Sequence, residues 1–127
     1  PSPTSWSSSQ QLRIAGVHLR PPVMEDGSAG LTTALETGPI RALEMQALME
    51  ATKAAPPALI AGDWNEQDSG HALRWLKASR GFRDALQEFV PRWKETHRWP
   101  FLYGTVLKKR LDHIAYDTSL LQCTGCG

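Results

Sequence analysis

Cysteine is scarce in this sequence: only Cys123 and Cys126 occur in 127 residues. Two cysteines cannot build the disulfide framework of a small secreted domain, so the fold must depend on a hydrophobic core. No apolar run approaches the roughly 18 residues that span a bilayer, and no targeting segment is evident, which predicts a soluble protein of unknown localisation. No charge of one sign dominates either. Fourteen Lys+Arg against thirteen Asp+Glu give a net charge of +1, which argues against a polybasic or acidic disordered chain.

The length and the 41% hydrophobic content suit one domain with a modest core. Residues 1–11 are rich in Ser, Pro and Gln, which predicts a flexible N-terminal segment. We expect the domain over residues 12–121 and a short C-terminal tail over 122–127.

The apolar pattern alternates between the periods of strands and helices. Residues 12–19 predict a buried strand, and residues 58–61 predict a central strand that runs into Gly-Asp-Trp-Asn, with Trp64 pointing into the core. A third strand is expected over 110–116, where His113 and Ala115 face away from Asp112 and Ile114.

Three helices are expected between these strands. The first begins near Pro39 with Thr37 or Gly38 as its cap, the second follows a cap at Asp68 or Ser69 and ends at Gly81, and a short third one covers 82–90. Residues 91–107 read as irregular. In the first helix Arg41, Glu44 and Glu50 are expected to turn outward, and the predicted inward stripe is Ile40, Leu43, Ala47, Leu48 and Ala51. This order of elements predicts an α/β fold whose ligands gather at the carboxyl ends of the strands.

Polar residues stand at three of these strand ends, namely His18, the pair Asp63 and Asn65, and Asp112. In extended geometry Asp63 and Asn65 would point the same way and offer two oxygen ligands to a metal ion or to an attacking water. The alternative is an Asx turn that only bends the chain from strand to helix.

Four motifs in order resemble the endonuclease/exonuclease/phosphatase superfamily, the metal-dependent phosphoesterases that include DNase I. They are Val17-His18-Leu19, Gly62-Asp63-Trp64-Asn65, Gly81-Phe82-Arg83-Asp84-Ala85 and Arg110-Leu111-Asp112-His113-Ile114. The resemblance covers residues 12–121. It implies part of a DNase I-like four-layered α/β sandwich, with one sheet and its flanking helices in this chain.

The resemblance also implies roles for individual residues. Asp63 would activate the attacking water, Asn65 would help to fix it, and His18 would contact the scissile phosphate. Asp63 and Asn65 would hold Mg²⁺ or Mn²⁺, while Asp112 would orient a histidine that this sequence does not contain. The family's other metal ligands and its C-terminal Ser-Asp-His are also absent. We therefore expect a fragment, with the remaining half of the domain or another chain covering an exposed apolar face of the sheet.

Positive charge is concentrated between residues 91 and 113, where six Lys and Arg face two acids. Lys108, Lys109 and Arg110 are candidate substrate-binding residues there, together with His18. Interleaved aromatic residues favour nucleic acid among phosphoester substrates, and a solvated loop is the alternative. His71 is expected to be structural or solvent-facing, and the cysteines to be incidental thiols or a local disulfide rather than half of a zinc site.

The sequence thus predicts a divalent-metal-dependent phosphodiesterase, a nuclease in first place. Two alternatives remain: a non-catalytic remnant that acts as a binding or assembly module, and an unrelated α/β domain in which His18, Asp63 and Asp112 lie far apart.

Overall fold

A computed structural model describes residues 11–21, 31–90, 95–100 and 106–127, with the backbone alone over 31–35, 97–100 and 106–109. Four strands form one mixed sheet in the order β1-β2-β6-β3. They are β1 (Ile14–His18), β2 (Leu59–Asp63), β6 (Asp112–Asp117) and β3 (Phe82–Asp84). β1 and β2 are parallel, whereas β6 is antiparallel to both β2 and β3. The expected α/β fold is confirmed.

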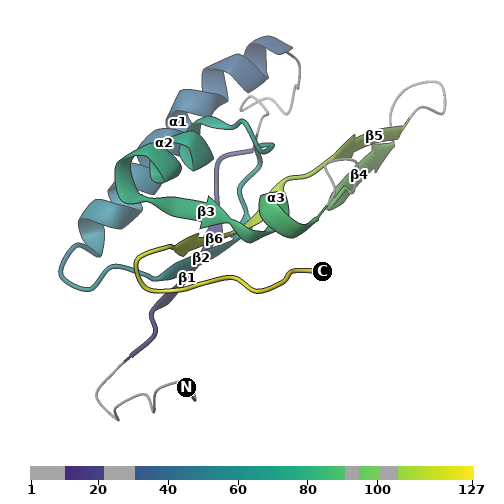
Figure 1. The fold of residues 1–127 in the computed structure, drawn as a ribbon. Helices are drawn as coiled ribbons and strands as arrows, with labels where there is room; N and C mark the ends of the chain where they lie inside the picture. The colour runs from purple at the N-terminus through teal and green to yellow at the C-terminus, as the bar shows by residue number, and fades with distance from the viewer. Residues whose placement is uncertain (1–10, 22–30, 91–94, 101–105) are drawn as a thin grey trace.

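Helices α1 (Leu31–Ala51) and α2 (His71–Arg80) follow β1 and β2 in the chain, and Figure 1 shows both on one side of the sheet. The short α3 (Ala85–Phe89) comes directly after β3. The hairpin of β4 (His97–Pro100) and β5 (Val106–Lys109) projects from the body of the fold (Figure 1). No helix in the described part of the chain is long and apolar enough to cross a membrane.

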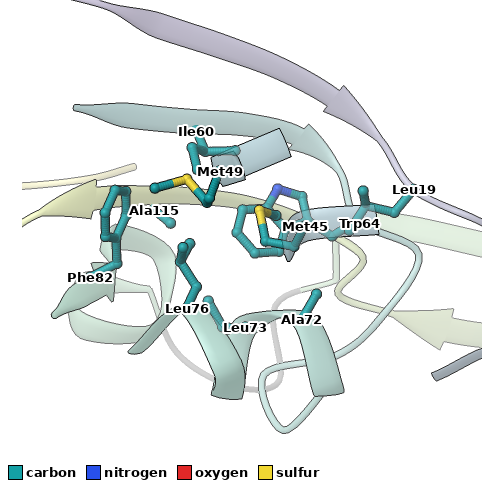
Figure 2. Close-up of a cluster of buried hydrophobic side chains, with 10 residues drawn as sticks. All are labelled: Leu19, Met45, Met49, Ile60, Trp64, Ala72, Leu73, Leu76, Phe82 and Ala115. Carbon is teal, nitrogen blue, oxygen red and sulfur yellow. The ribbon is translucent and has the colours of Figure 1, made fainter. Parts of the chain in front are cut away.

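The hydrophobic core lies between the sheet and these two helices (Figure 2). Ile60 and Trp64 enter it from β2 and the residues after it, and both are fully buried. Met45 of α1 and Leu73 of α2 meet them there, each with no exposed surface. Burying such a side chain contributes about 1.5–3 kcal/mol, so this layer stabilises the fold.

Strand β2 carries Gly62 at a position that no other residue could occupy. Its φ is 141°, and a Cβ built there would lie 2.1 Å from the carbonyl oxygen of Val17. The glycine therefore lets β1 pair closely with β2 immediately before Asp63.

The first strand differs from the prediction in its burial. β1 is an edge strand, and its burial alternates between exposed and half-buried residues. Ile14 is 63% exposed, and a Cβ at Gly16 would meet nothing within 4 Å. The prediction of a fully buried strand was wrong because only one face of the sheet is covered by helices.

Helix α1 begins at Leu31, eight residues before the predicted start, so Pro39 lies inside it. The predicted inward stripe was also wrong for Ile40 and Leu43, which are 41% and 62% exposed, and for Ala47 and Ala51, which are exposed as well. Arg41, expected to turn outward, is 5% exposed because it pairs with buried Glu66.

The cap of α2 is Gly70 rather than Asp68 or Ser69, and it makes no side-chain cap bond. The carboxylate of Glu66 satisfies the helix N-terminus instead, with Oε1 accepting from the backbone N–H of Leu73 at 2.8 Å. A negative charge is favourable there because the first N–H groups of a helix have no intrahelical partner. The predicted stop at Gly81 is confirmed by its left-handed conformation, with φ at 67°.

The remaining elements refine the prediction. The expected third helix over 82–90 divides into β3 and α3, because Asp84 ends the strand and caps the helix through the N–H of Leu86. The segment expected to be irregular contains β4 and β5. The last strand is β6, and the segment from 121 onward has no regular element. Most of the predicted N-terminal segment, residues 1–10, lies outside the described residues.

Candidate functional site

Three strand ends place polar side chains in one row on the uncovered face of the sheet. In the strand register His18 pairs with Asp63, and Asp63 pairs with Asp112. Residues that pair across neighbouring strands point to the same face. The row lies where the parallel strands β1 and β2 end and the antiparallel strand β6 begins. The pairing of these strands brings together three side chains from distant parts of the chain.

His18 and Asp63 form the accessible end of this row. The His18 Nε2 atom lies 3.8 Å from Asp63 Oδ2, and the two side chains are 75% and 39% exposed. This distance is too long for a hydrogen bond but short enough for electrostatic attraction to a protonated imidazole. Both groups can therefore be reached by a ligand from solvent.

Asp63 and Asn65 form the Asx turn that the sequence offered as the alternative to a pair of oxygen ligands. The backbone N–H of Asn65 donates to Asp63 Oδ1 at 2.9 Å, and the φ of Asn65 is 52°, in the left-handed region that asparagine tolerates. Its side-chain Nδ2 donates to the carbonyl of Leu19 at 2.8 Å. The turn thus fastens the end of β2 to the end of β1, and the amide oxygen of Asn65 is the side-chain atom able to act as a ligand.

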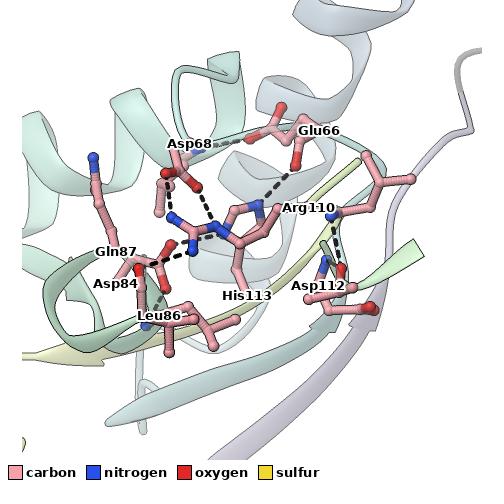
Figure 3. A network of polar contacts seen from close by, with 12 residues as sticks. Glu66, Asp68, Asp84, Leu86, Gln87, Arg110, Asp112 and His113 are labelled. Carbon is pink, nitrogen blue, oxygen red and sulfur yellow. Dashed lines mark hydrogen bonds and ion pairs between the residues drawn. The ribbon is translucent and has the colours of Figure 1, made fainter. Parts of the chain in front are cut away.

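Asp112 is half-buried at the start of β6. Its backbone N–H and that of Leu111 donate to Thr96 Oγ1 at 3.1 and 2.9 Å, which fixes the approach to the strand. Figure 3 shows Asp112 on the opposite side of β6 from His113, as the alternation of strand residues requires.

Arg110, predicted to bind substrate, lies inside the protein. Its side chain is 4% exposed and forms a two-point contact with Asp68, Nε to Oδ1 at 3.0 Å and Nη2 to Oδ2 at 2.6 Å. Nη1 also donates to the carbonyl of Val90. The hydrogen bond with Asp68 is the largest cause that raises the pKa of Arg110. Lys108 and Lys109 belong to β5, and their side chains lie outside the described residues.

Sequence reasoning missed the polar network beneath the row (Figure 3). His113 is fully buried, with Nδ1 2.7 Å from Asp84 Oδ2 and Nε2 2.7 Å from the carbonyl of Glu66. Burial alone would lower the pKa of His113, but the hydrogen bond and charge of Asp84, followed by the Glu66 carbonyl, raise it overall. A signal existed, because a histidine predicted on the apolar face of a strand needs a buried partner.

His71, expected to be structural or solvent-facing, packs against α1. A Cβ at Gly38 would lie 2.5 Å from His71 Nδ1, so the helices approach each other closely at this point. Cys123 and Cys126 are free thiols in the described structure.

Among the described residues, one group of three offers ligand atoms close enough to hold a metal ion: Asp68, Asp84 and His113, within 4.8 Å of one another. Arg110 occupies both carboxylate oxygens of Asp68, and His113 uses both ring nitrogens. A divalent cation would have to replace these contacts and lie beside a guanidinium. This donor set suits an internal ion network better than a metal centre.

The strand-end row has a different donor chemistry. Asp63 offers a carboxylate that is 39% exposed, and Asn65, which is buried at 6%, offers its amide oxygen; oxygen ligands are those that Mg²⁺ and Mn²⁺ prefer. Asp112 adds a second carboxylate on the neighbouring strand. The row brings together no group of three His, Cys, Asp or Glu ligand atoms within 4.8 Å among the described residues, so a magnesium-type ion on the Asp63 and Asn65 oxygens would keep several water ligands.

A scan against protein-family models finds no match to this chain, and a search of the curated proteins finds none either. A functional assignment therefore depends on the residues and on the geometry described above.

Proposed function

We propose that this chain is part of a divalent-metal-dependent phosphoesterase that hydrolyses phosphodiester bonds. The observation that carries the proposal is the register of His18, Asp63 and Asp112 across three strand ends. An imidazole beside two carboxylates, all on one open face, provides both a hydrogen-bond donor for phosphate oxygens and bases for water. The register contradicts the separation of these residues that an unrelated α/β domain predicts, whereas the Asx turn that the same alternative predicts is present.

Each residue has a distinct task in the proposed reaction. His18, whose side chain is 75% exposed at the end of β1, donates a hydrogen bond to a non-bridging phosphate oxygen. Asp63 accepts a hydrogen bond from the attacking water and aligns the water with the phosphorus. The Asx turn holds the Asp63 carboxylate in place through the N–H of Asn65. Asp112 would orient the histidine that the family resemblance implies and that these 127 residues do not contain.

A magnesium or manganese ion would be held by Asp63 Oδ2 and the Asn65 amide oxygen. When bound, it would supply positive charge that offsets the negative charge gathering on the phosphate oxygens. Further ligands, such as the glutamate that the family resemblance implies, would come from outside these 127 residues.

A nucleic acid is the preferred substrate class within this proposal. Apart from Arg110, which is buried against Asp68, residues 91–113 carry five Lys and Arg against two acids, and the segment includes Asp112. Basic residues that neutralise backbone phosphates make affinity for nucleic acid fall steeply with salt. Small phosphate esters would show a weaker dependence.

The test is phosphodiester hydrolysis by the intact protein with Mg²⁺, before and after chelation, in wild type and in Asp63→Asn. Asparagine still accepts the Asn65 N–H, so the turn and the stability should be retained, while turnover should fall by at least about a hundredfold. Asp117→Asn is the matched control, because Asp117, like Asp63, is the last residue of a strand, here β6, and its carboxylate binds Ser119 rather than the row.

A second candidate function is a non-catalytic binding module. It is favoured by the finding that, among the described residues, three metal-ligating groups do not meet at the row. Wild-type protein that binds a phosphodiester without cleaving it in the presence of Mg²⁺, equally well in Asp63→Asn, would establish this alternative in place of the enzyme.

A further inference from the structure

One buried ion pair and one buried hydrogen bond join the loop after β2 to the start of β6 on the helix side of the sheet (Figure 3). Arg110 binds Asp68, and His113 binds the backbone carbonyl of Glu66. Arg110 and His113 lie on either side of Asp112 in sequence. Their partners, Asp68 and Glu66, follow Asn65. The contacts therefore connect the two segments that carry the strand-end row.

The proton arrangement of His113 follows from its partners. The Glu66 carbonyl can only accept, so Nε2 must carry a hydrogen. The contact of Nδ1 with Asp84 then needs a second proton, which a protonated imidazole beside an ionised carboxylate provides. Asp84 is itself fixed, because its other oxygen accepts from the N–H of Leu86 at 3.0 Å.

The ladder between β2 and β6 does not reach Asn65. Its registered pairs end at Asp63 with Asp112, and the N–H of Trp64 adds one bond to the Leu111 carbonyl at 2.9 Å. Beyond that point His113 holds the Glu66 carbonyl, while Arg41 and the N-terminus of α2 hold the Glu66 carboxylate. The residue that follows Asn65 is thus anchored through both its backbone and its side chain.

We propose that His113, held by Asp84, is a positioning residue that keeps the Asn65 turn in its left-handed conformation and so sets Asp63 on the opposite face of the sheet. This inference rests on the proposed phosphodiesterase function for its catalytic consequence. His113 touches neither substrate nor reacting atoms; it acts through Glu66 and Asn65. Partners of this kind behind a site's ligands commonly change activity or metal affinity by about 10–100-fold.

The experiment compares wild type, Asp84→Asn, and the double variant Asp84→Asn with His113→Phe. In Asp84→Asn a neutral imidazole still donates from Nε2 to Glu66, while Nδ1 accepts from the new amide. Phenylalanine keeps the edge contact with Trp64, now 5.6 Å between ring centroids, but loses both hydrogen bonds. Because both variants lack the buried carboxylate charge, the comparison isolates the two hydrogen bonds of the imidazole, of which the bond to Glu66 is the one that reaches the Asn65 turn. Arg83→Gln, at an exposed position of β3, is the surface control.

Two readouts are taken: backbone amide exchange at residues 64–66, and kcat and KM with a phosphodiester and Mg²⁺. The double variant should lose at least about tenfold protection at the Asn65 amide while Ile114 and Ala115 in β6 stay protected. Its kcat should fall about 10–100-fold relative to Asp84→Asn, with KM within about twofold. Asp84→Asn should keep the protection of Asn65.

Unchanged protection at Asn65 in the double variant would overturn the positioning role, and so would an equal loss across β2 and β6, which is what a purely structural core residue would give. If the wild type proves inactive while protection at Asn65 is lost selectively, the proposed function fails and the control of the turn by His113 stands.

Discussion

Glu66 shows how one residue connects the site to the fold. Its carboxylate is almost fully buried, accepts from the N–H groups of Ala72 and Leu73, and pairs with Arg41 at 3.3 Å. Gly70 makes this possible, because a Cβ there would lie 2.2 Å from the Glu66 carboxyl carbon. The backbone carbonyl of the same residue receives His113. Loss of Glu66 would thus affect the core and the strand-end row together.

Gly70→Ala should therefore destabilise the protein by about 1–3 kcal/mol, since the carboxylate must leave the helix N-terminus and Arg41 loses its partner. Urea unfolding followed by circular dichroism measures the change. Gly125→Ala is the control, because nothing lies within 4 Å of a Cβ at Gly125. Equal stability of the two variants would show that Glu66 does not cap α2 in solution.

The buried His113 makes stability depend on pH. Because the folded protein raises the pKa of His113 above its ordinary value of 6.5, the protonated ring binds Asp84 more strongly in the folded than in the unfolded chain. That stabilisation is fully present below about pH 6.5 and is lost as pH rises through the folded-state pKa. Unfolding free energies across this range should fall with rising pH in wild type more than in the double variant of Asp84 and His113. Parallel pH profiles would contradict this.

At the scale of elements, the strands were easier to predict than the first helix. β2 follows from a short continuous apolar run and β6 from alternation with period two, and their register pairs Asp63 with Asp112. α1 could not be predicted well, because its buried face carries Arg41 and its exposed face carries Leu43. A buried ion pair reverses the polarity on which a periodicity argument depends.

This reversal gives a direct comparison within α1. Leu43→Ser changes a side chain that is 62% exposed, and should alter stability by less than about 1 kcal/mol. Met45→Ala removes a fully buried side chain from the core, and should cost about 2–5 kcal/mol. Thermal unfolding of both variants measures the difference; a larger loss for Leu43→Ser would mean that the predicted inward stripe was right and the observed helix orientation wrong.

At the scale of the whole molecule, helices cover one side of the sheet and the strand-end row occupies the other. Ile14 and Ile114 remain exposed or half-buried on this face, whereas Tyr116 on the same face is 6% exposed and its hydroxyl donates to Glu88. The sequence predicted such a face from the family resemblance, along with the residues of the row. It could not predict that Arg110 turns inward, since a basic segment reads the same whether its charges face solvent or a buried acid such as Asp68.

The most direct measurement is the location of a paramagnetic ion on the intact protein. Mn²⁺ added in small amounts should broaden the amide resonances around Asp63, Asn65 and Asp112, and Asp63→Asn should remove the effect. Broadening centred on Asp68, Asp84 and His113, or broadening that persists in Asp63→Asn, would contradict a metal-dependent site at the strand ends.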